Sequence, residues 1–255
     1  MQKFKLAFSF LFFMWLFSAD AQDNGAQRTL RTSGSFRSTR GNEVPQRSAE
    51  LVHPNTSGKG WVSLFNDSLT NAIFPAGVWT LQDGVLTASK DESIWSEKAY
   101  DNFVLDLEFK NAPGTNSGVV VHASNIEDWI PHSVEIQIAD DWSEKWSKVV
   151  PSWQCAAIFG HQPATKHLVK KPGEWNHYTI TCKGRMIWVV LNGELVNTCD
   201  MSLYTSATDN IDGTKAPDWL SNPMATLPLH GHIGLQGKHA GAPIYFRNIK
   251  VKELK

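Results

Sequence analysis

The stretch "HSVEIQIADDW" (132–142) alternates between apolar and polar side chains, as a half-buried β-strand does. Side chains of a strand point to opposite faces in turn. One face is therefore predicted to carry Val134, Ile136 and Ile138, and the other Ser133, Glu135, Gln137 and Ala139. The polar face is either an ordinary solvated surface or the floor of a site, and the pattern of this strand alone leaves both open.

Further short apolar runs divided by turn residues follow from Trp61 to the end of the chain. Asp-Gly in "QDG" (82–84) and Asn-Gly in "LNGE" (191–194) predict tight hairpins, because these pairs accept positive φ. About ten such strands without an internal repeat favour a single all-β domain, a sandwich or jelly roll rather than a propeller. The long segments 140–172 and 200–229 are expected to cover an end or a face of the sandwich.

The first 21 residues have the basic start, short apolar run and small residues of a signal peptide. Residues 22–58 are rich in Ser, Thr, Arg and Gly and are predicted to be a flexible leader, which leaves 59–255 as the folded domain. We therefore expect an exported protein, periplasmic or extracellular, with no membrane insertion after the signal is removed. Cys155, Cys182 and Cys199 are predicted to be buried free thiols, since two strand spacings, about 9–10 Å, would separate the last two.

The composition limits the classes of partner. The chain has 255 residues, with 24 basic and 25 acidic side chains and a net charge of −1, so nothing favours nucleic acid or an anionic membrane surface. Its 11 tryptophans fit either a β core or the stacking surfaces of a sugar site, and for any single Trp the core is the commoner place.

Two neighbouring runs extend the polar face of the opening strand. A hairpin between 116–124 and 132–142 would bring His122 near Glu135, and the alternation in "HGHIGLQGKH" (230–239) places Gln236 and Lys238 on a shared face. The predicted floor of the site consists of His122, Glu135, Gln137, Gln236 and Lys238.

Other catalytic signals are weak or absent. His230 and His232 have metal-ligand spacing and Glu135 or Asp140 could complete a site, but a lone His-x-His is more often structural. The sequence has no G-x-S-x-G and no phosphate-binding glycine loop. It also lacks the Glu-x-Asp-x-x-Glu strand of laminarinase-type jelly rolls.

A set of motifs resembles one known family. "GWVSLFND", "NSGVVVHAS", "VEIQIAD", "GEWN", "GLQ" and "FRNIKVK" occur in the order and character of the DUF1080 family, also called the 3-keto-disaccharide hydrolase domain, from about Gly60 to Leu254. The resemblance implies a concanavalin A-like jelly roll and an exported enzyme that cleaves 3-keto-glycosides. His122 stands where an Arg is frequent in the family, and "LQGKH" replaces "LQDHG", so substrate choice does not carry over.

The chemistry implied by the resemblance is removal of the C2 proton, elimination at C1 and hydration. It assigns His122 or Glu135 as the base, and Lys238, His239 or a divalent metal ion as the group that stabilises the enolate. Gln137 and Gln236 would hold sugar hydroxyls. Trp142, Trp153 or Trp219 would stack on the ring. Arg247, which matches the family motif, is predicted at the substrate site in a mainly structural role, paired with Glu135. The alternative is a non-catalytic carbohydrate-binding module on the same fold, because one fold hosts many functions.

Overall fold

The structure is a computed structural model that describes residues 53–255. The predicted signal peptide (1–21) and residues 22–52 of the predicted leader lie outside the described residues. No helix in the described part is long and apolar enough to span a membrane.

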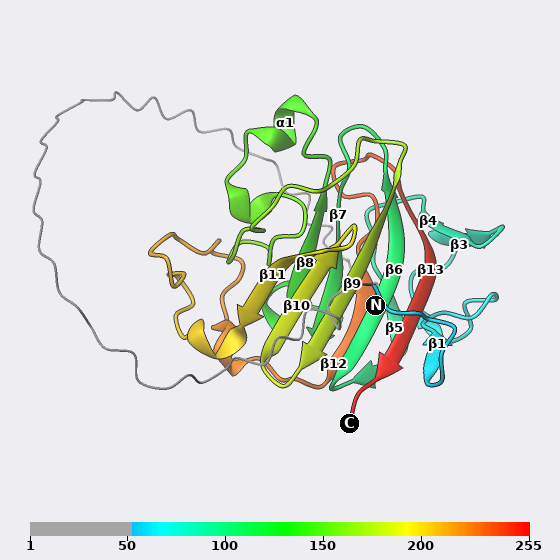
Figure 1. Ribbon diagram of the computed structural model, residues 1–255, viewed down its shortest axis with the longest axis horizontal. Coiled ribbons are helices and arrows are strands. Elements are labelled where there is room, and N and C mark those ends of the chain that lie inside the picture. Colours follow the sequence, from blue (N-terminus) through cyan, green and yellow to red (C-terminus); the bar gives the residue numbers. More distant parts are fainter. Residues whose placement is uncertain (1–52) are drawn as a thin grey trace, which may run out of the picture. The chain divides into compact units, whose positions relative to one another are not determined.

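Two antiparallel sheets pack face to face (Figure 1). The larger sheet has the strand order β11-β10-β9-β6-β13-β4-β3, with β1 paired to β13. Its strands are β1 (Trp61–Ser63), β3 (Trp79–Gln82), β4 (Val85–Ala88), β6 (Phe103–Asn111), β9 (Trp175–Lys183), β10 (Met186–Leu191), β11 (Glu194–Asp200) and β13 (Ile244–Glu253). The smaller sheet has the order β2-β5-β12-β7-β8. Its strands are β2 (Ala72–Ile73), β5 (Ile94–Tyr100), β7 (Asn116–Ala123), β8 (Val134–Ala139) and β12 (Gly231–Leu235).

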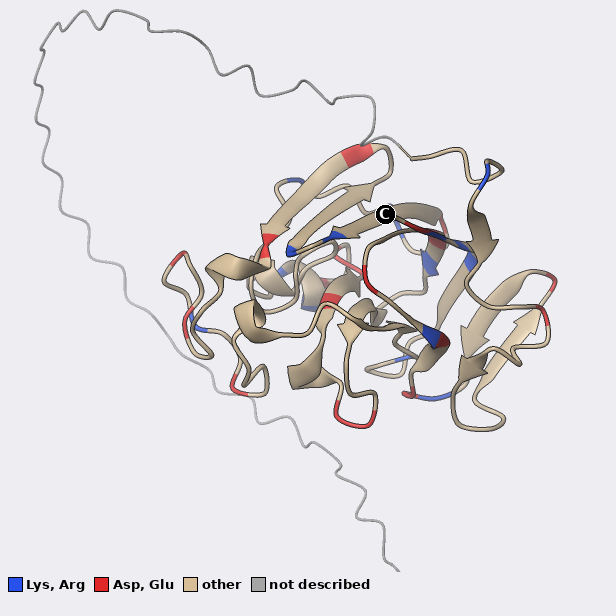
Figure 2. Ribbon diagram, turned by 90° about the horizontal axis from the view of Figure 1, so that it is seen from below, with Lys and Arg blue, Asp and Glu red and all other residues tan. Residues whose placement is uncertain are grey.

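Helical structure in the described residues is confined to single turns in the connections. These are α1 (Glu144–Ser147), capped by Ser143, and the 3₁₀ turns η1 (Ile130–His132), η2 (Pro151–Trp153), η3 (Met201–Leu203) and η4 (Met224–Thr226). Charged positions of both signs are scattered over the loops and strands (Figure 2).

The core lies between the two sheets because every long strand buries alternate side chains there. Leu105 and Leu107 of β6 and Ile180 of β9 belong to the same buried cluster as Val119 and Ile136 of the smaller sheet. The all-β, concanavalin A-like jelly-roll sandwich is therefore confirmed. Cys155, Cys182 and Cys199 are buried and free, as predicted.

Both predicted hairpin turns are confirmed. Asp83 and Gly84 have φ of 51° and 73°, and Asn192 and Gly193 have φ of 51° and 90°. These left-handed pairs join β3 to β4 and β10 to β11, as two-residue turns of this kind do.

β8, the opening strand of the sequence, pairs with β7 as predicted, with Val120 opposite Glu135 and Gly118 opposite Gln137. Beyond this pair β7 has an irregularity: His122 has φ of 55°, and the register between β7 and β12 shifts in the same region. The bulge reverses the alternation of β7, so His122 lies on the core side and not beside Glu135.

The two long segments cover the edge beyond β8. In the first, the backbone of residues 156–159 bonds to β8, with Ala156 N–H to Gln137 O at 2.9 Å and Phe159 N–H to Glu135 O at 2.9 Å. The second packs on the first, because a Cβ on Gly160 would lie 2.7 Å from Leu220 Cδ1 and 2.8 Å from Pro217 Cδ. The segments thus build a wall along one side of the smaller sheet.

Candidate functional site

A row of residues crosses the outer face of the smaller sheet, away from the core. The strand registers place Trp95 opposite Gly234, Gly234 opposite Val120, and Val120 opposite Glu135. Phe159 continues the row beyond β8 through its bond to the Glu135 carbonyl. The face therefore has aromatic side chains at both ends and a single carboxyl group near one end.

Two glycines leave the middle of this face without side chains. A Cβ on Gly234 would lie 2.3 Å from Trp95 Cζ3, and a Cβ on Gly118 would lie 2.1 Å from Glu135 Oε1. Real Cβ atoms do not approach other atoms so closely. The absence of side chains at these positions lets the Trp95 indole and the Glu135 carboxyl lie flat against the sheet.

Glu135 has the most perturbed carboxyl on this face. Burial raises its pKa from 4.5 to about 8, the nearby His239 lowers it and Asp91 raises it further. Within the described residues, only burial and the charges of His239 and Asp91 act on this carboxyl group, and no hydrogen bond does. A carboxyl group whose pKa is raised this far by burial is a candidate acid or base.

His239 forms a second titratable group next to Glu135. Its Nδ1 donates to Asp91 Oδ2 at 2.7 Å. This bond raises the pKa of His239, with further increases from the charges of Asp91 and Glu135 against the effects of burial and of Lys145. The face therefore pairs a carboxyl that tends to keep its proton with an imidazole that tends to gain one.

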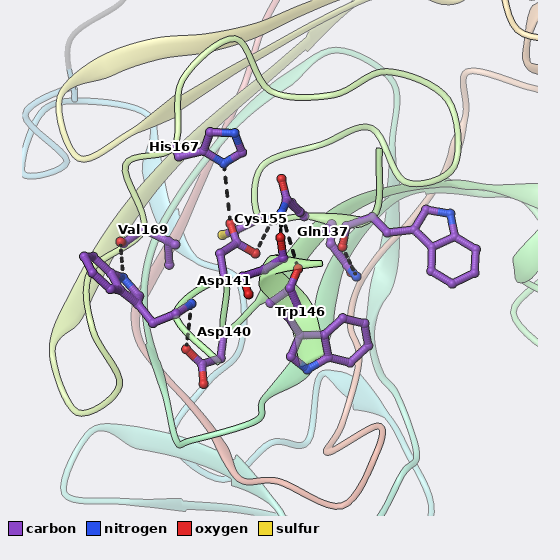
Figure 3. Close-up of polar contacts among 12 residues, drawn as sticks. Gln137, Asp140, Asp141, Trp146, Cys155, His167 and Val169 are labelled. Atoms are coloured by element: carbon purple, nitrogen blue, oxygen red, sulfur yellow. Dashed lines mark hydrogen bonds and ion pairs between the residues drawn. The ribbon is translucent and has the colours of Figure 1, made fainter. Parts of the chain in front are cut away.

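Gln137, beside Glu135, is buried with 1% of its surface exposed. Its Nε2 donates to Asn116 Oδ1 and to the Trp153 carbonyl, both at 3.1 Å, and Figure 3 shows the second of these bonds. Its Oε1 is buried and has no partner among the described residues. Because both amide hydrogens are occupied, the Gln137 side chain is fixed in place beneath the surface of the face.

Two tryptophans stand at the wall side of the face. The rings of Trp153 and Phe159 are 5.5 Å apart, and those of Trp153 and Trp219 are 5.9 Å apart. Trp219 remains 48% exposed. Two of the three predicted stacking residues, Trp153 and Trp219, thus lie together. The Gln137 side chain donates a hydrogen bond to the backbone carbonyl of Trp153.

A pocket of about 490 Å³ opens on the opposite side of the face. It is lined by Ile73, Phe74, Pro75, Asp91, Glu92, Ser93, Trp95, Ile126, Glu127, Trp129, Ile130, Gln236 and His239. Gln236 and His239 connect it to the row that carries Glu135. Its size is in the range of small-molecule sites.

The sequence profile of the 3-keto-alpha-glucoside-1,2-lyase-like domain matches residues 60–252. The chain belongs to this family. A 3-keto-disaccharide hydrolase of Bacteroides thetaiotaomicron is 25% identical to it over 233 residues, which are 76% of this chain and 79% of that protein.

Solved structures agree with the family assignment. A crystal structure of a candidate glycosyl hydrolase from Parabacteroides distasonis ATCC 8503 has 55% sequence identity and a TM-score of 0.74, and the match covers 76% of this chain and 99% of that one. A second such structure from the same organism has 23% identity and a TM-score of 0.63 over 77% of this chain and 94% of that one, and it shows the fold alone.

His122 does not occupy the place predicted for it. Its Nδ1 donates to the Leu229 carbonyl at 2.7 Å, its ring lies 6.0 Å from that of Phe103 in the core, and none of its surface is exposed. Burial lowers its pKa to about 4. A side chain on the core side of the sheet cannot act as a base over the outer face, so the prediction that placed His122 beside Glu135 is wrong.

Arg247 lies on the wrong sheet for its predicted partner. Its Nε and Nη2 donate to Glu108 at 2.8 and 3.1 Å, and its guanidinium stacks on Trp175 at 4.0 Å. All three residues belong to the larger sheet. The predicted pair between Arg247 and Glu135 is therefore wrong, and Glu108 takes that place.

Asp140 and Trp142 stand where β8 ends, in a turn that is joined to neighbouring loops (Figure 3). The Asp140 carboxylate accepts from Gly114 N–H at 2.8 Å and from Trp142 N–H at 3.2 Å. The Trp142 indole donates to the Val169 carbonyl at 2.9 Å. Both side chains therefore form hydrogen bonds that connect neighbouring loops. Neither side chain lines the pocket next to His239.

The metal-ligand candidates do not come together. His230 bonds to Asp101 at 3.1 Å, and His232 bonds to the Ser96 carbonyl at 2.8 Å. Neither forms a ligand cluster with Asp140 or Glu135 among the described residues. Lys238 is half-buried, and its backbone N–H donates to the Lys90 carbonyl at 3.3 Å.

One cluster of metal-ligating side chains does occur in the described part, on the larger sheet: His53, Asp106 and His177. The two imidazoles are stacked 3.5 Å apart with planes 11° from parallel. A metal ion bound by a histidine nitrogen lies in the plane of the imidazole ring. The planes of two stacked, nearly parallel rings do not meet near the rings, so no single ion can lie in both planes. Both nitrogens of His53 are also taken, by Thr179 Oγ1 and by Gly193 N–H, each at 2.8 Å. The three side chains therefore form a hydrogen-bonded cluster and not a metal site.

Several residues of the face were not identified from the sequence. Trp95 lies on β5, whose buried positions do not alternate, so no period-two pattern marks it as a strand. Asp91 and Trp129 lie in connections, where periodicity carries no information. The turn signals around these segments could have shown only that loops were present.

Proposed function

We propose that the chain cleaves 3-keto-glycosides on the outer face of the smaller sheet, by elimination across C1 and C2 followed by hydration. The family assignment and the named relative support a carbohydrate-acting enzyme. The observation that carries the choice of site is the pairing of Glu135, with a pKa raised to about 8, and the His239–Asp91 couple on one face of the smaller sheet.

Glu135 is the proposed base. A ketone at C3 acidifies the C2 hydrogen, and a base works best when its pKa lies close to the working pH. Burial raises the pKa of Glu135 to about 8, which makes its carboxylate a stronger base than an exposed one. The proton moves from C2 to the carboxylate as electrons shift to the C3 oxygen.

His239 is the proposed partner that stabilises the negative oxygen. Asp91 favours its imidazolium form, and a positioned cation lowers the energy of an enolate. Loss of the C1 substituent then gives an enone, and the departing oxygen takes the proton that Glu135 removed from C2. Water adds to C1, its proton passes to Glu135, and this proton then returns to C2. The net change is hydrolysis of the glycosidic bond.

Gln137 and Gln236 are proposed to bind sugar hydroxyls, and Trp153 with Trp219 to stack on the ring. Gln236 lines the pocket beside His239, whereas the unpartnered Oε1 of Gln137 is buried, so a hydroxyl would reach it only after a shift of the neighbouring side chains. Action outside the cytoplasm is part of the proposal and rests on the signal-like first 21 residues.

The test uses the purified protein with a 3-keto-glucoside and with its unoxidised parent, each with and without chelator. Release of the aglycone from the 3-keto compound alone supports elimination, and inhibition by chelator would add a divalent metal ion to the mechanism. With Glu135 as base, kcat/KM should rise with pH up to about 8, the value to which burial raises its pKa. Binding of either sugar without cleavage would favour the carbohydrate-binding module instead.

A further inference from the structure

The pocket beside His239 differs in character from the rest of the face. Trp95 and Trp129 form its inner wall, with ring centroids 5.8 Å apart and planes at 60°. Phe74, Ile126 and Ile130 extend this apolar lining. Trp95 is 5% exposed and packs on Val120 and Ala123, so the wall is held by the sheet.

The charged groups of the pocket are mainly acidic. Asp91, Glu92 and Ser93 come from one connection, and Glu127 is a further acid. Trp95, Trp129 and Phe74 are three aromatic rings in one small pocket, a lining that suits a flat apolar group. An anionic group would meet three carboxyl side chains and only one imidazole.

We propose that this pocket receives the leaving group and selects a flat, apolar, uncharged aglycone such as an aryl group. The inference rests on the proposed function and adds the substrate class. Burial of an aromatic ring against Trp129 and Phe74 gains free energy from apolar area and ring packing. The leaving oxygen then lies toward Gln236, which lines the pocket next to the catalytic row.

The positions of the two aromatic surfaces assign the sugar and the aglycone to different sides of Glu135. Glu135 stands between the Trp95 end of the row and the Phe159 end, where Trp153 and Trp219 provide the other aromatic surface. The keto sugar occupies the side with Trp153 and the exposed Trp219, whose rings lie 5.9 Å apart. The aglycone occupies the side with Trp95 and Trp129, which line the pocket.

The test compares three substrates that share the 3-keto-glucosyl group and differ in the aglycone: p-nitrophenyl, methyl and a second glucose. Wild type, Trp129→Ala and Trp188→Ala are measured on each. Trp188 is a half-buried tryptophan of β10 on the larger sheet, outside the pocket, and is the matched control. Ratios of variant to wild type for each substrate remove the different reactivities of the leaving groups.

We expect Trp129→Ala to lower kcat/KM for the p-nitrophenyl compound about tenfold or more, mainly through KM, from the loss of ring packing and apolar burial. The methyl compound should change less than about twofold, and Trp188→Ala should alter none of the ratios. Equal losses on all three substrates would overturn the inference by placing the sugar in the pocket. No loss on the aryl compound would also overturn it. Absence of wild-type turnover on every substrate would overturn the proposed function itself.

Discussion

The carboxyl group of Glu135 lies directly against Gly118 of the neighbouring strand, so that a Cβ on Gly118 would meet Oε1 at 2.1 Å and both Cδ and Cγ at 2.7 Å. Gly118 is opposite Gln137 in the register. The glycine therefore determines where the carboxyl group rests, because any other side chain would occupy its place.

Gly118→Ala should misplace Glu135 without removing it. We expect a loss of up to about 10²-fold in kcat/KM, since a displacement of about 1 Å can cost that much. The double variant Gly118→Ala/Glu135→Gln tests the route. If the alanine acts through Glu135, it should cause no further loss when Glu135→Gln is already present. An equal loss with and without Glu135→Gln would show that Gly118 acts in another way.

Asp91→Asn should shift the pH dependence of the reaction. The bond from His239 to Asp91 is the main cause of the raised pKa of His239, so its loss should lower that pKa. The limb of the kcat/KM profile that reports loss of the imidazolium should move to lower pH. Asp101→Asn, at the distant His230 pair, is the control and should leave this limb in place. An unmoved limb in Asp91→Asn would remove His239 from the mechanism.

His122→Asn should change how stability depends on pH. Folding lowers the pKa of His122 from 6.5 to about 4, so the unfolded chain binds a proton in this window and the folded protein does not. Stability from this group is complete above pH 6.5 and is lost as pH falls toward 4, by roughly 3 kcal/mol in all. Asn tolerates the positive φ of this position and does not titrate.

Denaturant unfolding at about pH 7 and about pH 5 measures this effect. Wild type should lose roughly 2 kcal/mol more than His122→Asn over this interval. Equal losses in the two proteins would mean that His122 takes up a proton in the folded state.

Arg247→Ala should affect stability rather than activity. The side chain bonds twice to Glu108 and stacks on Trp175 on the larger sheet. We expect a loss of about 1–2 kcal/mol in the free energy of unfolding, with kcat/KM for a 3-keto-glucoside unchanged when corrected for folded protein. A large rise in KM would return Arg247 to the substrate site.

Most of the fold and part of the site could be predicted from the alternation of apolar and polar residues within single strands. The inward faces of β6, β8 and β9 follow a period of two, and Asp-Gly and Asn-Gly mark the turns of the hairpins without tertiary information. Glu135, Gln137 and Gln236 were predicted on one face for the same reason. His122 does not join them, because a one-residue bulge reverses the facing of the residues beyond it and leaves no mark in the composition.

The remaining features of the site depend on which strands become neighbours. β13, with Arg247, pairs with β6 and not with β8, so its partner is Glu108. Asp91 reaches His239 because the chain before β5 lies against the chain after β12, where Lys238 N–H bonds to Lys90 O. Such long-range pairings are properties of the assembled sheets, and local patterns do not encode them.

Aglycone release from a 3-keto-glucoside by Glu135→Gln, compared with wild type at about pH 8, tests the central claim most directly. Folding raises the pKa of this carboxyl from 4.5 to about 8, so the folded protein loses stability as pH rises through this window. The variant should therefore unfold at a higher temperature than wild type at about pH 8, while its turnover falls by about 10²–10⁴-fold. Turnover within a few-fold of wild type would contradict the assignment of Glu135 as the base.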